Sequence, residues 1–589
     1  MKRTLAAGCL AVLGWLASLG LAGVIYVDDD APAGGNGANW NTAYQFLQDA
    51  LTAAVANDEI RVAGGTHRPD RDAAHPGGTG SRSATFHLKN GVAVHGGYAG
   101  LADPNDPDRR DFVLFESVLS GDLAGNDGPN FANYADNSHH VATGTGADTF
   151  ALLDGFTVRG GNTSGAPVLH GGGFYAGSGA PLLQRCKFVF NRSDGRGGGG
   201  YLVSTGRPLI ASCTFSGNYC SDGGGGIGVG QGDVDFVDCE FASNNNILYG
   251  GGLAFHGASN VTMTRCVVRN NLNCNSGGAM YCGVAAAGNL TMVDCAITNN
   301  SAVYIGGIME RGGHATLMNC IIAGNTANGS GQWGFGGGLG CSGSSTTTSV
   351  LTNCTIVGNS GTTYGGGVSC YESASTTLNN CVLWGNTAPN GAQIAIGNRI
   401  AAATVSVRYG DSQGGAAAVY VGTGSTLNWG PGNIDANPLF VSPGAGDYRL
   451  GGGSPCIDAG DNAAVSRDAS DLDMDGCRTD WLSDLDGNLR FHDDLTTPDT
   501  GVGTGPIVDM GAYEVGAGPD TAPQPCPGDL NCDGTVGFGD INPFVLVLSN
   551  PSAWQASYPA CDILNGDVSN NGAVAFDDIN PFVALLSGP

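Results

Sequence analysis

The hexapeptide CTFSGN, at residues 213–218, is one of eight short segments that begin with Cys and end with Asn. The other seven are CKFVFN (from 186), CEFASN (from 239), CVVRNN (from 266), CAITNN (from 295), CIIAGN (from 320), CTIVGN (from 354) and CVLWGN (from 381). Successive segments start 25 to 34 residues apart. A recurrence at this interval indicates a solenoid, in which each coil buries its apolar face against the neighbouring coils.

Each repeat contains three short segments in which apolar residues recur at every second position. The first and third residues of every hexapeptide are apolar, as are Cys213 and Phe215, and another apolar residue lies three positions before each Cys. Gly-rich segments such as GGGFYA (from 171) and GGGLAF (from 250) introduce the third alternating pair. A period of two, with no helical period between the segments, predicts three strands per coil, with coils stacked about 4.8 Å apart. We therefore predict an all-β fold, a parallel β-helix solenoid whose regular repeats span residues 151–410.

Two residue types recur at fixed places in this pattern. The Cys residues form an inward column, and we interpret them as small apolar core residues rather than disulfide partners. The Asn that ends each hexapeptide follows a strand, where it tolerates a left-handed turn conformation and its amide can hydrogen-bond to the next coil. These Asn residues are therefore expected to be structural: Asn191, Asn218, Asn244, Asn271, Asn300, Asn325, Asn359 and Asn386.

The FxxN segment from Phe215 to Asn218, followed by Gly225, Gly226 and Ile227, resembles the repeats of bacterial polymorphic outer-membrane proteins. More broadly, the repeats resemble right-handed β-helix proteins of the pectin-lyase-like fold. The resemblance covers about residues 150 to 410 and implies a right-handed solenoid. Because such folds host many functions, it says more about architecture than about activity.

The bulk composition restricts the classes of partner, and the N-terminus indicates export. The 589 residues carry a formal net charge of −28, with 46 Asp against 6 Glu, which argues against binding nucleic acid or anionic membranes and suggests turns and metal sites. Residues 1–23 combine Lys2 and Arg3 with an apolar run and small residues, which predicts a signal peptide cleaved near Ala22 or Gly23. An uncleaved anchor is the alternative, since the run approaches spanning length. We predict a secreted or cell-surface protein with no membrane span in the mature chain.

The segments at 24–150 and 411–515 flank the regular repeats and are expected to close the ends of the solenoid. WNTAYQFLQDALTAAV (from 40) predicts a helix across the N-terminal mouth, followed by irregular first coils. Either Asn41 or Thr42 can cap this helix, and Tyr44, Leu47 and Leu51 share one face.

After the repeats, NPLFVSPGAGDYRLGGGSPCIDAGD (from 437) and VDMGAYE (from 508) resemble the segment that often closes such helices in bacterial surface proteins. Between them lies an acidic loop at 468–486, in which Asp471, Asp473, Asp475 and Gly476 imitate the first half of a calcium loop. The loop either binds a metal ion or forms solvated turns.

The sharpest motif is in the tail. A linker at 516–525 precedes GDLNCDGTVGFGDINPFVLVL and GDVSNNGAVAFDDINPFVALL, which repeat 38 residues apart. Each fits a twelve-residue calcium loop, in which alternate residues ligate the ion and a Gly at position six permits the reversal. The predicted Ca²⁺ ligands are Asp529, Asn531, Asp533, the Thr535 carbonyl and Asp540, and then Asp567, Ser569, Asn571, the Ala573 carbonyl and Asp578. The second loop has fewer charged ligands and is expected to bind calcium more weakly.

The two loops each end in Asp and are each followed by a helix, with no helix before the loop. This arrangement resembles a dockerin over residues 526–589. The resemblance implies an α-helical module that docks to a cohesin-like or other surface protein. Phe538, Gly539, Phe576 and Asp577 occupy loop positions ten and eleven, where cellulosomal dockerins commonly carry Ser or Thr pairs. A partner other than a standard cohesin therefore stays open.

Cysteines outside the repeat column have several possible partners. Cys456 and Cys477 can pair with each other, and Cys526 can pair with Cys532. Cys561 is then left without an obvious mate, because Asn570 stands at the equivalent of Cys532 in the second loop.

One outward cluster has the composition of a catalytic site. Asp238, Arg265 and Asp294 precede the Cys in three successive repeats and are predicted to stack on one face, with Glu240 and Arg269 beside them. β-Helix polysaccharide lyases use carboxylates with an Arg or Lys base, and β-helix glycoside hydrolases use paired Asp. A surface ion-pair ladder, which contributes little stability, is the interpretation that we favour.

The leading hypothesis is a secreted or cell-surface β-helix protein that binds carbohydrate or has a structural role, docked through its calcium-dependent tail. The alternative is a polysaccharide-degrading enzyme, a lyase or an O-glycosyl hydrolase, because dockerin-type tails often accompany such enzymes. Glu310 and Arg311 interrupt an apolar strand pattern, and the sequence offers no reason for this.

Overall fold

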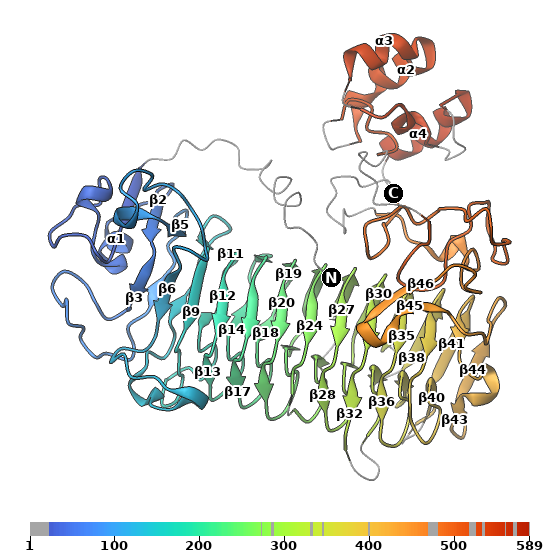
Figure 1. The fold of residues 1–589 in the computed structure, drawn as a ribbon, viewed down its shortest axis with the longest axis horizontal. Helices are drawn as coiled ribbons and strands as arrows, with labels where there is room; N and C mark the ends of the chain where they lie inside the picture. The colour runs from blue at the N-terminus through green and yellow to red at the C-terminus, as the bar shows by residue number, and fades with distance from the viewer. Residues whose placement is uncertain are drawn as a thin grey trace. The chain divides into compact units, whose positions relative to one another are not determined.

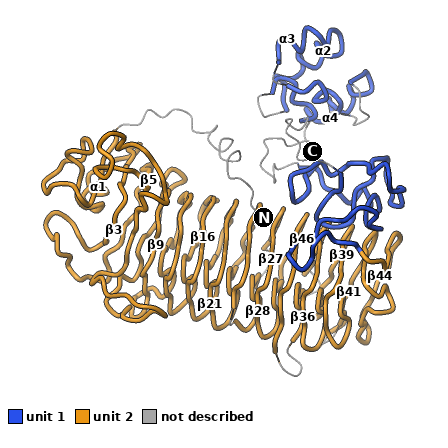
Figure 2. The backbone as a smooth tube through the Cα atoms, in the orientation of Figure 1, with its two compact units in different colours: residues 1–17, 438–589 blue, residues 18–437 orange. Residues whose placement is uncertain are grey.

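The computed structural model describes residues 23–272, 274–283, 288–329, 334–343, 347–397, 401–468, 481–516, 526–532, 536–559, 561–568 and 574–587. The chain separates into two compact units, residues 18–437 and residues 438–589 together with 1–17, and each is described by itself (Figure 2). The predicted signal peptide and almost all of the predicted linker lie outside the described residues. Among the helices of the described segments, none has the length and apolar character needed to cross a bilayer.

The described residues from 23 to 437 form a right-handed parallel β-helix with three long sheets, through which each coil passes in turn (Figure 1). Sheet 1 contains β1 (Val24–Val27), β2 (Glu59–Ala63), β5 (Ala93–Tyr98), β8 (Leu152–Asp154), β11 (Leu182–Gln184), β15 (Leu209–Ala211), β19 (Val234–Val237), β23 (Asn260–Thr264), β26 (Asn289–Val293), β30 (His314–Met318), β34 (Thr348–Thr352), β38 (Ser375–Asn379), β41 (Thr404–Arg408) and β44 (Thr426–Trp429). Sheet 2 contains β3 (Gly65–His67), β6 (Ser117–Ser120), β9 (Phe156–Arg159), β12 (Lys187–Val189), β16 (Thr214–Ser216), β20 (Glu240–Ala242), β24 (Val267–Arg269), β27 (Ala296–Thr298), β31 (Ile321–Ala323), β35 (Thr355–Val357), β39 (Val382–Trp384) and β42 (Asp411–Ser412). Sheet 3 contains β4 (Phe86–His87), β7 (Ala142–Thr143), β10 (Phe174–Ala176), β14 (Gly200–Val203), β18 (Ile227–Gln231), β22 (Leu253–Phe255), β25 (Met280–Gly283), β29 (Ile308–Arg311), β33 (Leu339–Ser342), β37 (Val368–Cys370), β40 (Ile394–Ile396) and β43 (Tyr420–Val421).

Two small sheets add further coil-to-coil pairing between sheets 2 and 3. One contains β13 (Arg192–Ser193), β17 (Tyr219–Cys220) and β21 (Asn245–Asn246), and the other contains β28 (Ser301–Ala302), β32 (Thr326–Ala327) and β36 (Ser360–Gly361). The predicted three-strand coil is confirmed, and parallel pairing continues beyond residue 410 as far as Trp429.

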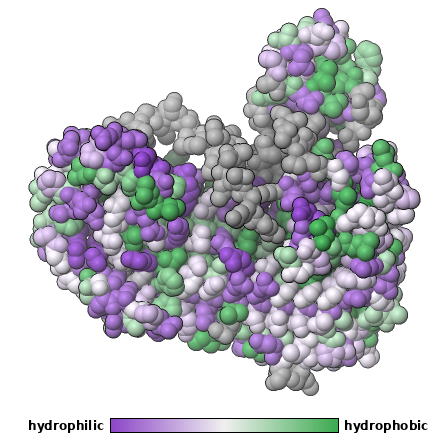
Figure 3. All heavy atoms as spheres, in the orientation of Figure 1, coloured by the Kyte–Doolittle hydropathy of each residue, from purple (hydrophilic) through white to green (hydrophobic). Residues whose placement is uncertain are grey.

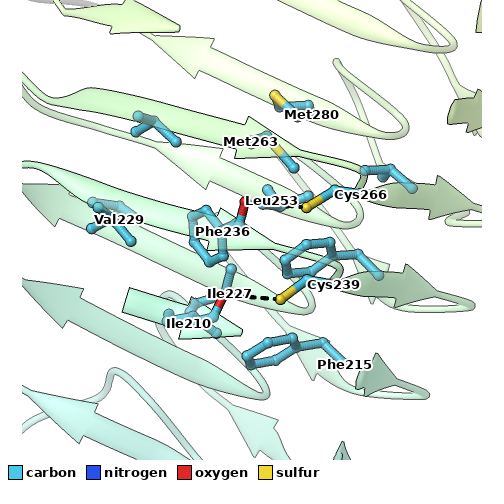
Figure 4. Packing of buried hydrophobic residues seen from close by; sticks show 14 of the residues in the cluster. Ile210, Phe215, Ile227, Val229, Phe236, Cys239, Leu253, Met263, Cys266 and Met280 are labelled. Carbon is cyan, nitrogen blue, oxygen red and sulfur yellow. Dashed lines mark hydrogen bonds between the residues drawn. The ribbon is translucent and has the colours of Figure 1, made fainter. Parts of the chain in front are cut away.

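The repeated hexapeptide spans one turn and one strand of each coil. Cys213 lies in the turn before β16, whereas the sequence predicted that it opens the strand, and both Cys213 and Phe215 point inward and are buried. The Cys column packs among aliphatic and aromatic side chains from all three sheets (Figure 4). Phe215 stacks between Phe188 and Phe241, with ring centroids 4.8 and 5.1 Å apart. The prediction of an apolar Cys column is therefore confirmed.

The terminal Asn residues form a buried ladder, as predicted. The Asn271 side chain accepts hydrogen bonds from the backbone and side-chain nitrogens of Asn244, and it donates to the Phe241 carbonyl and to the Asn300 side chain. The expectation that the Asn itself takes the left-handed conformation is wrong. The residue before it does so, with φ between 53° and 65°, because the Asn must turn its amide inward along the column. These preceding residues are Phe190, Gly217, Ser243, Asn270, Asn299, Gly324, Gly358 and Gly385.

The N-terminal helix is shorter than predicted. It divides into a 3₁₀ turn, η2 (Trp40–Thr42), capped by Asn39, and the helix α1 (Leu47–Ala53), whose Leu47 and Leu51 are buried against the first coils. Between them, Tyr44 exchanges backbone hydrogen bonds with Tyr26 and Asp28, which holds it in an extended strand-like conformation. Tyr44 therefore packs against the core beside α1 rather than on it.

The second unit, from residue 438, contains a short antiparallel pair and a helical module. The pair is β45 (Phe440–Ser442) and β46 (Asp447–Leu450). The module at 526–587 contains α2 (Ile541–Ser549), α3 (Pro551–Ser557) and α4 (Ile579–Ser587), with 3₁₀ turns η10 (Phe538–Asp540), η11 (Ile563–Gly566) and η12 (Phe576–Asp578). Its small core includes Phe544 stacked on Phe582 at 4.2 Å, together with Trp554 and Leu530.

Replacing Asn271 by Ala should strongly destabilise the β-helix. The change removes four hydrogen bonds inside the solenoid and leaves buried partners unsatisfied, at about 1 kcal/mol each, or about 4 kcal/mol together. The free energy of unfolding from urea titration measures this. Asn289→Ala, which removes one exposed bond to Asn260, is the control and should cost less than about 1 kcal/mol. Equal losses from the two variants would contradict a structural role for the ladder.

Candidate functional site

The predicted outward cluster forms ion pairs in the structure. Arg265 makes a two-pronged contact with Asp238 at 2.8 and 3.0 Å, and Arg269 contacts Glu240 at 2.6 Å. Asp294 is buried and accepts a hydrogen bond from Asn319 at 3.2 Å. The residues stack in successive coils as predicted, and the two pairs are solvent-exposed. A catalytic role for them stays a prediction.

A cleft of about 740 Å³ lies on the first coils, where the sequence predicted no site. Its floor is the turn after sheet 2, which includes Arg159 at the end of β9 and Phe190 after β12. Its wall is a long excursion between β6 and β7 that contains η4 (Pro129–Phe131) and η5 (Tyr134–Asp136). The excursion folds over the coils that follow it and thereby creates the concavity.

The excursion is held in a constrained conformation. Asn130, Phe131 and Asn133 have φ values of 55°, 61° and 66°, which is a rare conformation for a bulky residue such as Phe131. The Tyr134 hydroxyl donates to the Phe190 carbonyl at 2.9 Å, which ties the excursion to a later coil. The Phe131 ring packs edge-on against Tyr134 with centroids 5.2 Å apart. The surrounding contacts therefore fix this wall in place.

The cleft contains two arginine side chains, a carboxyl group with one oxygen that lacks a hydrogen-bond partner, and aromatic side chains. Arg68 uses its Nε to reach the Asp122 carbonyl at 2.8 Å, and Arg159 forms no ion pair with any described residue. Asp127 accepts from Asn137 through Oδ2, but its buried Oδ1 has no hydrogen-bond partner. Burial raises the pKa of Asp127 to about 6, although the Asn137 hydrogen bond opposes this.

The sequence contained one signal for this cleft. Phe190 stands at the turn position that is Gly, Ser or Asn in the seven following repeats, and there it has φ 53° and is 59% exposed. A large aromatic residue in a left-handed turn costs conformational energy and gains little burial. Such a departure from the repeat favours a role in binding.

Guanidinium groups with free donors bind carboxylates in two-pronged fashion, and flat aromatic rings contact the apolar faces of sugar rings. The cleft can therefore hold an acidic saccharide, with Arg68 and Arg159 on its carboxylates and Phe190 on its ring faces. Asp127 can exchange a proton near neutral pH, which is the property expected of a general acid.

The C-terminal module concentrates acids without cations. Residues 526–589 contain seven Asp and no Lys, Arg, His or Glu. Asp529, Asp540, Asp567 and Asp578, predicted at the first and twelfth positions of the two loops, are all buried. Carboxylates are rarely buried without a counter-charge, so these four fit a bound hard cation such as Ca²⁺.

The two loops share one local geometry at their closing Asp. Asp540 accepts the N–H groups of Leu530, Asn531 and Gly537, which brings the described start and end of the loop together at this carboxylate. Asp578 likewise accepts the N–H of Ala575 at 2.7 Å. Of the remaining predicted ligands, only Asn531 is among the described residues. The others lie outside them: Asp533, Thr535, Ser569, Asn571 and Ala573.

The module also presents a duplicated apolar surface, part of which is visible in Figure 3. Phe538 and Phe576 are 80% and 79% exposed. The exposed residues that follow them on the exit helices also correspond across the 38-residue repeat: Ile541 and Val545 on α2, Ile579 and Val583 on α4. Large exposed apolar residues gathered in this way are typical of interaction surfaces.

The predicted pairing of Cys526 with Cys532 is wrong, because the structure joins Cys532 to Cys561 across Cα atoms 5.9 Å apart. The two loop segments face each other across the small core, which brings Cys561 beside the first loop although the repeat gives it no equivalent partner. Cys477, the predicted partner of Cys456, lies outside the described residues, as do Asp471, Asp473, Asp475 and Gly476.

Glu310, which the sequence left unexplained, lies inside the solenoid. It pairs in register with Cys282 and Cys341, at a position that is apolar elsewhere in sheet 3. The Gly313 N–H donates to it at 2.9 Å, and a cavity of about 30 Å³ beside it is large enough for water. Burial raises the pKa of Glu310 to about 7. Arg311 is the next residue and points outward into solvent.

Comparison with protein families agrees with this architecture. The family model described as a right-handed β-helix region matches residues 145–305 and 230–406. No curated protein matches the chain. Among solved structures, the pectate lyase Pel9A aligns with 13% identity and a TM-score of 0.36, covering 84% of this chain and 97% of that one.

Replacing Glu310 by Gln should flatten the pH dependence of stability. The folded pKa of about 7 lies above the ordinary 4.5, so the stability contributed by Glu310 is full below pH 4.5 and is lost as pH rises through 7. The free energy of unfolding of the natural chain should fall by roughly 3 kcal/mol relative to Glu310→Gln over that range. Urea titrations between pH 4 and 8 measure this.

Glu116→Gln, which changes an exposed carboxyl on the same β-helix, is the matched control for the loss of one carboxylate. Parallel profiles for the natural chain and Glu310→Gln would show that Glu310 does not titrate in this range.

Proposed function

We propose that this chain is a secreted or cell-surface binding protein, in which the β-helix binds an acidic polysaccharide and the C-terminal module docks the protein to a partner in a calcium-dependent manner. The cleft between the excursion after β6 and the turns of β9 and β12 carries the first part of the proposal. The acidic, cation-free module at 526–589 carries the second.

The chemistry of the cleft favours a uronic-acid polymer. Arg159 and the terminal nitrogens of Arg68 retain donors for carboxylates, and Phe190 adds an exposed ring at the rim. The overall charge of −28 would repel a polyanion at most other surfaces, so binding is expected to be confined to this cleft.

The tail favours docking to another protein. Asp529, Asp540, Asp567 and Asp578 are buried and stand, in sequence, at the first and twelfth positions of the predicted calcium loops, and the exit helices expose matching apolar residues. A cohesin-like protein or another surface protein is the expected partner class, with Phe538 and Phe576 at the contact. Each half of the duplicated surface can serve alone, because both halves present a Phe, an Ile and a Val at equivalent positions, although Gly539 in the first corresponds to Asp577 in the second.

A polysaccharide-degrading activity is the second candidate, and Asp127 is the observation that favours it. Its unpartnered Oδ1 and a pKa near 6 suit proton transfer in a cleft that also holds Arg159. In a lyase the arginine would assist abstraction of a proton beside the uronate carboxylate; in a hydrolase Asp127 would protonate the leaving oxygen.

Calorimetric titration should detect binding of polygalacturonate or alginate, but not of a neutral mannan, to the full chain. Arg159→Gln should weaken binding at least tenfold, about 1.4 kcal/mol, because it removes a cation that contacts the polymer. Phe190→Ala should act similarly by removing ring stacking. Arg269→Gln, in the exposed pair with Glu240, is the control and should bind normally.

Unchanged affinity in both Arg159→Gln and Phe190→Ala would place binding elsewhere. New reducing ends or unsaturated products in the same mixtures would indicate an enzyme. In that case Asp127→Asn should abolish product formation while retaining affinity.

Calcium should stabilise the C-terminal module. A site that binds only the folded state adds about 2.7 kcal/mol at a hundredfold excess of ligand over its Kd. Trp554 reports on this, because its Nε1 donates to the Leu530 carbonyl at 3.1 Å. The melting temperature followed by its fluorescence should rise when calcium is added. The Trp554→Phe variant shows which part of the fluorescence signal comes from Trp554. Asp529→Asn should reduce the shift more than Asp567→Asn does, since the first loop has more charged ligands. An identical shift in the double variant would exclude the loops as calcium sites.

A further inference from the structure

The segment between the β-helix and the module contains a further acidic cluster. Carboxylate oxygens of Asp458, Asp493 and Asp499 all lie within 4.8 Å of one another. These residues belong to neither the repeats nor the two tail loops. They also differ from the acidic residues at 471–475 that the sequence analysis singled out.

Asp458 is the unusual member of the cluster. Its side chain is 0% exposed, and neither carboxylate oxygen has a hydrogen-bond partner. The nearby Asp494 N–H lowers the pKa of Asp458, but it is the smallest of the influences on that pKa. Its backbone is strained, with φ 49°. A buried carboxylate that lacks donors is costly, so its position needs another source of stabilisation.

Neighbouring buried acids in the same segment are satisfied by the backbone. Asp484 accepts from the N–H groups of Asp486, Asn488 and Glu514. Asp509 accepts from those of Asp458 and Val515, and Glu514 from that of Asp509. The segment therefore supplies N–H donors to these three carboxylates, whereas Asp458 faces other carboxylates instead.

The charges around Asp458 act in one direction. Burial is the largest influence, and the carboxylates of Asp493, Asp499 and Asp494 add to it, so that the pKa of Asp458 rises to about 6. The buried Arg490 is directed to Glu514, at 3.5 Å, and to the Gly511 carbonyl. No basic side chain among the influences on Asp458 offsets the repulsion.

We propose that Asp458, Asp493 and Asp499 bind one Ca²⁺ ion. Ca²⁺–oxygen distances of 2.3–2.6 Å place two ligands of one ion at most about 5 Å apart, so oxygens within 4.8 Å of one another can share it. Asp458 supplies the buried ligand, and the more accessible Asp493 and Asp499 leave room for water to complete the coordination shell.

The ion would join two stretches of backbone. The Asp458 carbonyl accepts from the N–H groups of Thr500 and Gly501, and Gly460 pairs with Val508 and Val502. The 493–499 loop thus lies against the strand-like segment at 456–460, and a shared ion would fix the loop to it.

The test counts calcium bound to the full chain, by equilibrium dialysis and elemental analysis, in a background that carries Asp529→Asn and Asp567→Asn. This background silences the tail loops, so the two proposals are separated. Asp458→Asn should bind one calcium fewer per chain than the background. Asp447→Asn, in the same unit but paired with Arg449, is the matched control and should keep the full count.

Thermal melting gives a second readout, because Asp458→Asn should change the melting temperature in opposite directions, relative to the background, in chelator and in calcium. In chelator, Asp458→Asn should melt higher than the background, because it removes a buried unpaired charge. With calcium, the background should gain stability and Asp458→Asn should not. A purely structural role for Asp458 would instead lower the melting temperature in both conditions and would overturn the proposal.

Asp493→Asn combined with Asp499→Asn covers the case in which Asp458→Asn does not fold, since both changes lie on the accessible side of the cluster. This double variant should also lose one calcium per chain. Retention of the full calcium count in either variant would contradict the site, and displacement of the ion by equimolar Mg²⁺ would overturn the choice of calcium.

Discussion

The rest of the β-helix depends on the hydrogen bonds that pass from each coil to the next. Every coil must return the chain to the same place, and the buried Asn ladder enforces this, because each amide joins the coils before and after its own. Side chains that point outward escape this constraint, and so do excursions between strands. The long excursion after β6 uses that freedom, and it forms the cleft without disturbing the sheet below it.

A second constraint is electrostatic. Of the partly or fully buried carboxylates among the described residues, four groups bear on function: Asp127 in the cleft, Glu310 in the core, Asp458 after the β-helix, and the buried Asp residues of the tail. Backbone N–H groups or a water-sized cavity relieve some of them, as for Glu310. The tail has no basic residue at all, and Asp458 faces further acids, so a hard cation is the counter-charge that we propose in both places.

Much of the fold could be predicted because it repeats. Eight copies of one pattern revealed the strands, the inward Cys column and the Asn ladder, since each position recurs in the same environment. Features that occur once were harder. The helix near Trp40 was predicted too long, because the contacts of Tyr44 with Tyr26 and Asp28 override local helix propensity. The Cys532–Cys561 disulfide joins residues that are not equivalent in the repeat. The cleft needs Arg68, Asp127, Arg159 and Phe190 from distant coils, and only the odd residue at Phe190 hinted at it.

The Asn ladder has a direction as well as a shape. Each side-chain oxygen faces the preceding coil, from Asn191, which receives the Gly161 N–H, to Asn386, whose amide ends on Gln393. The amide dipoles are thus oriented alike and add along the rod, as peptide dipoles do in an α-helix. The component of each amide dipole along the rod therefore has its negative end toward the N-terminal coils and its positive end toward Gln393. A coil inserted without its Asn would divide this row into two shorter dipoles, even if its strands paired correctly.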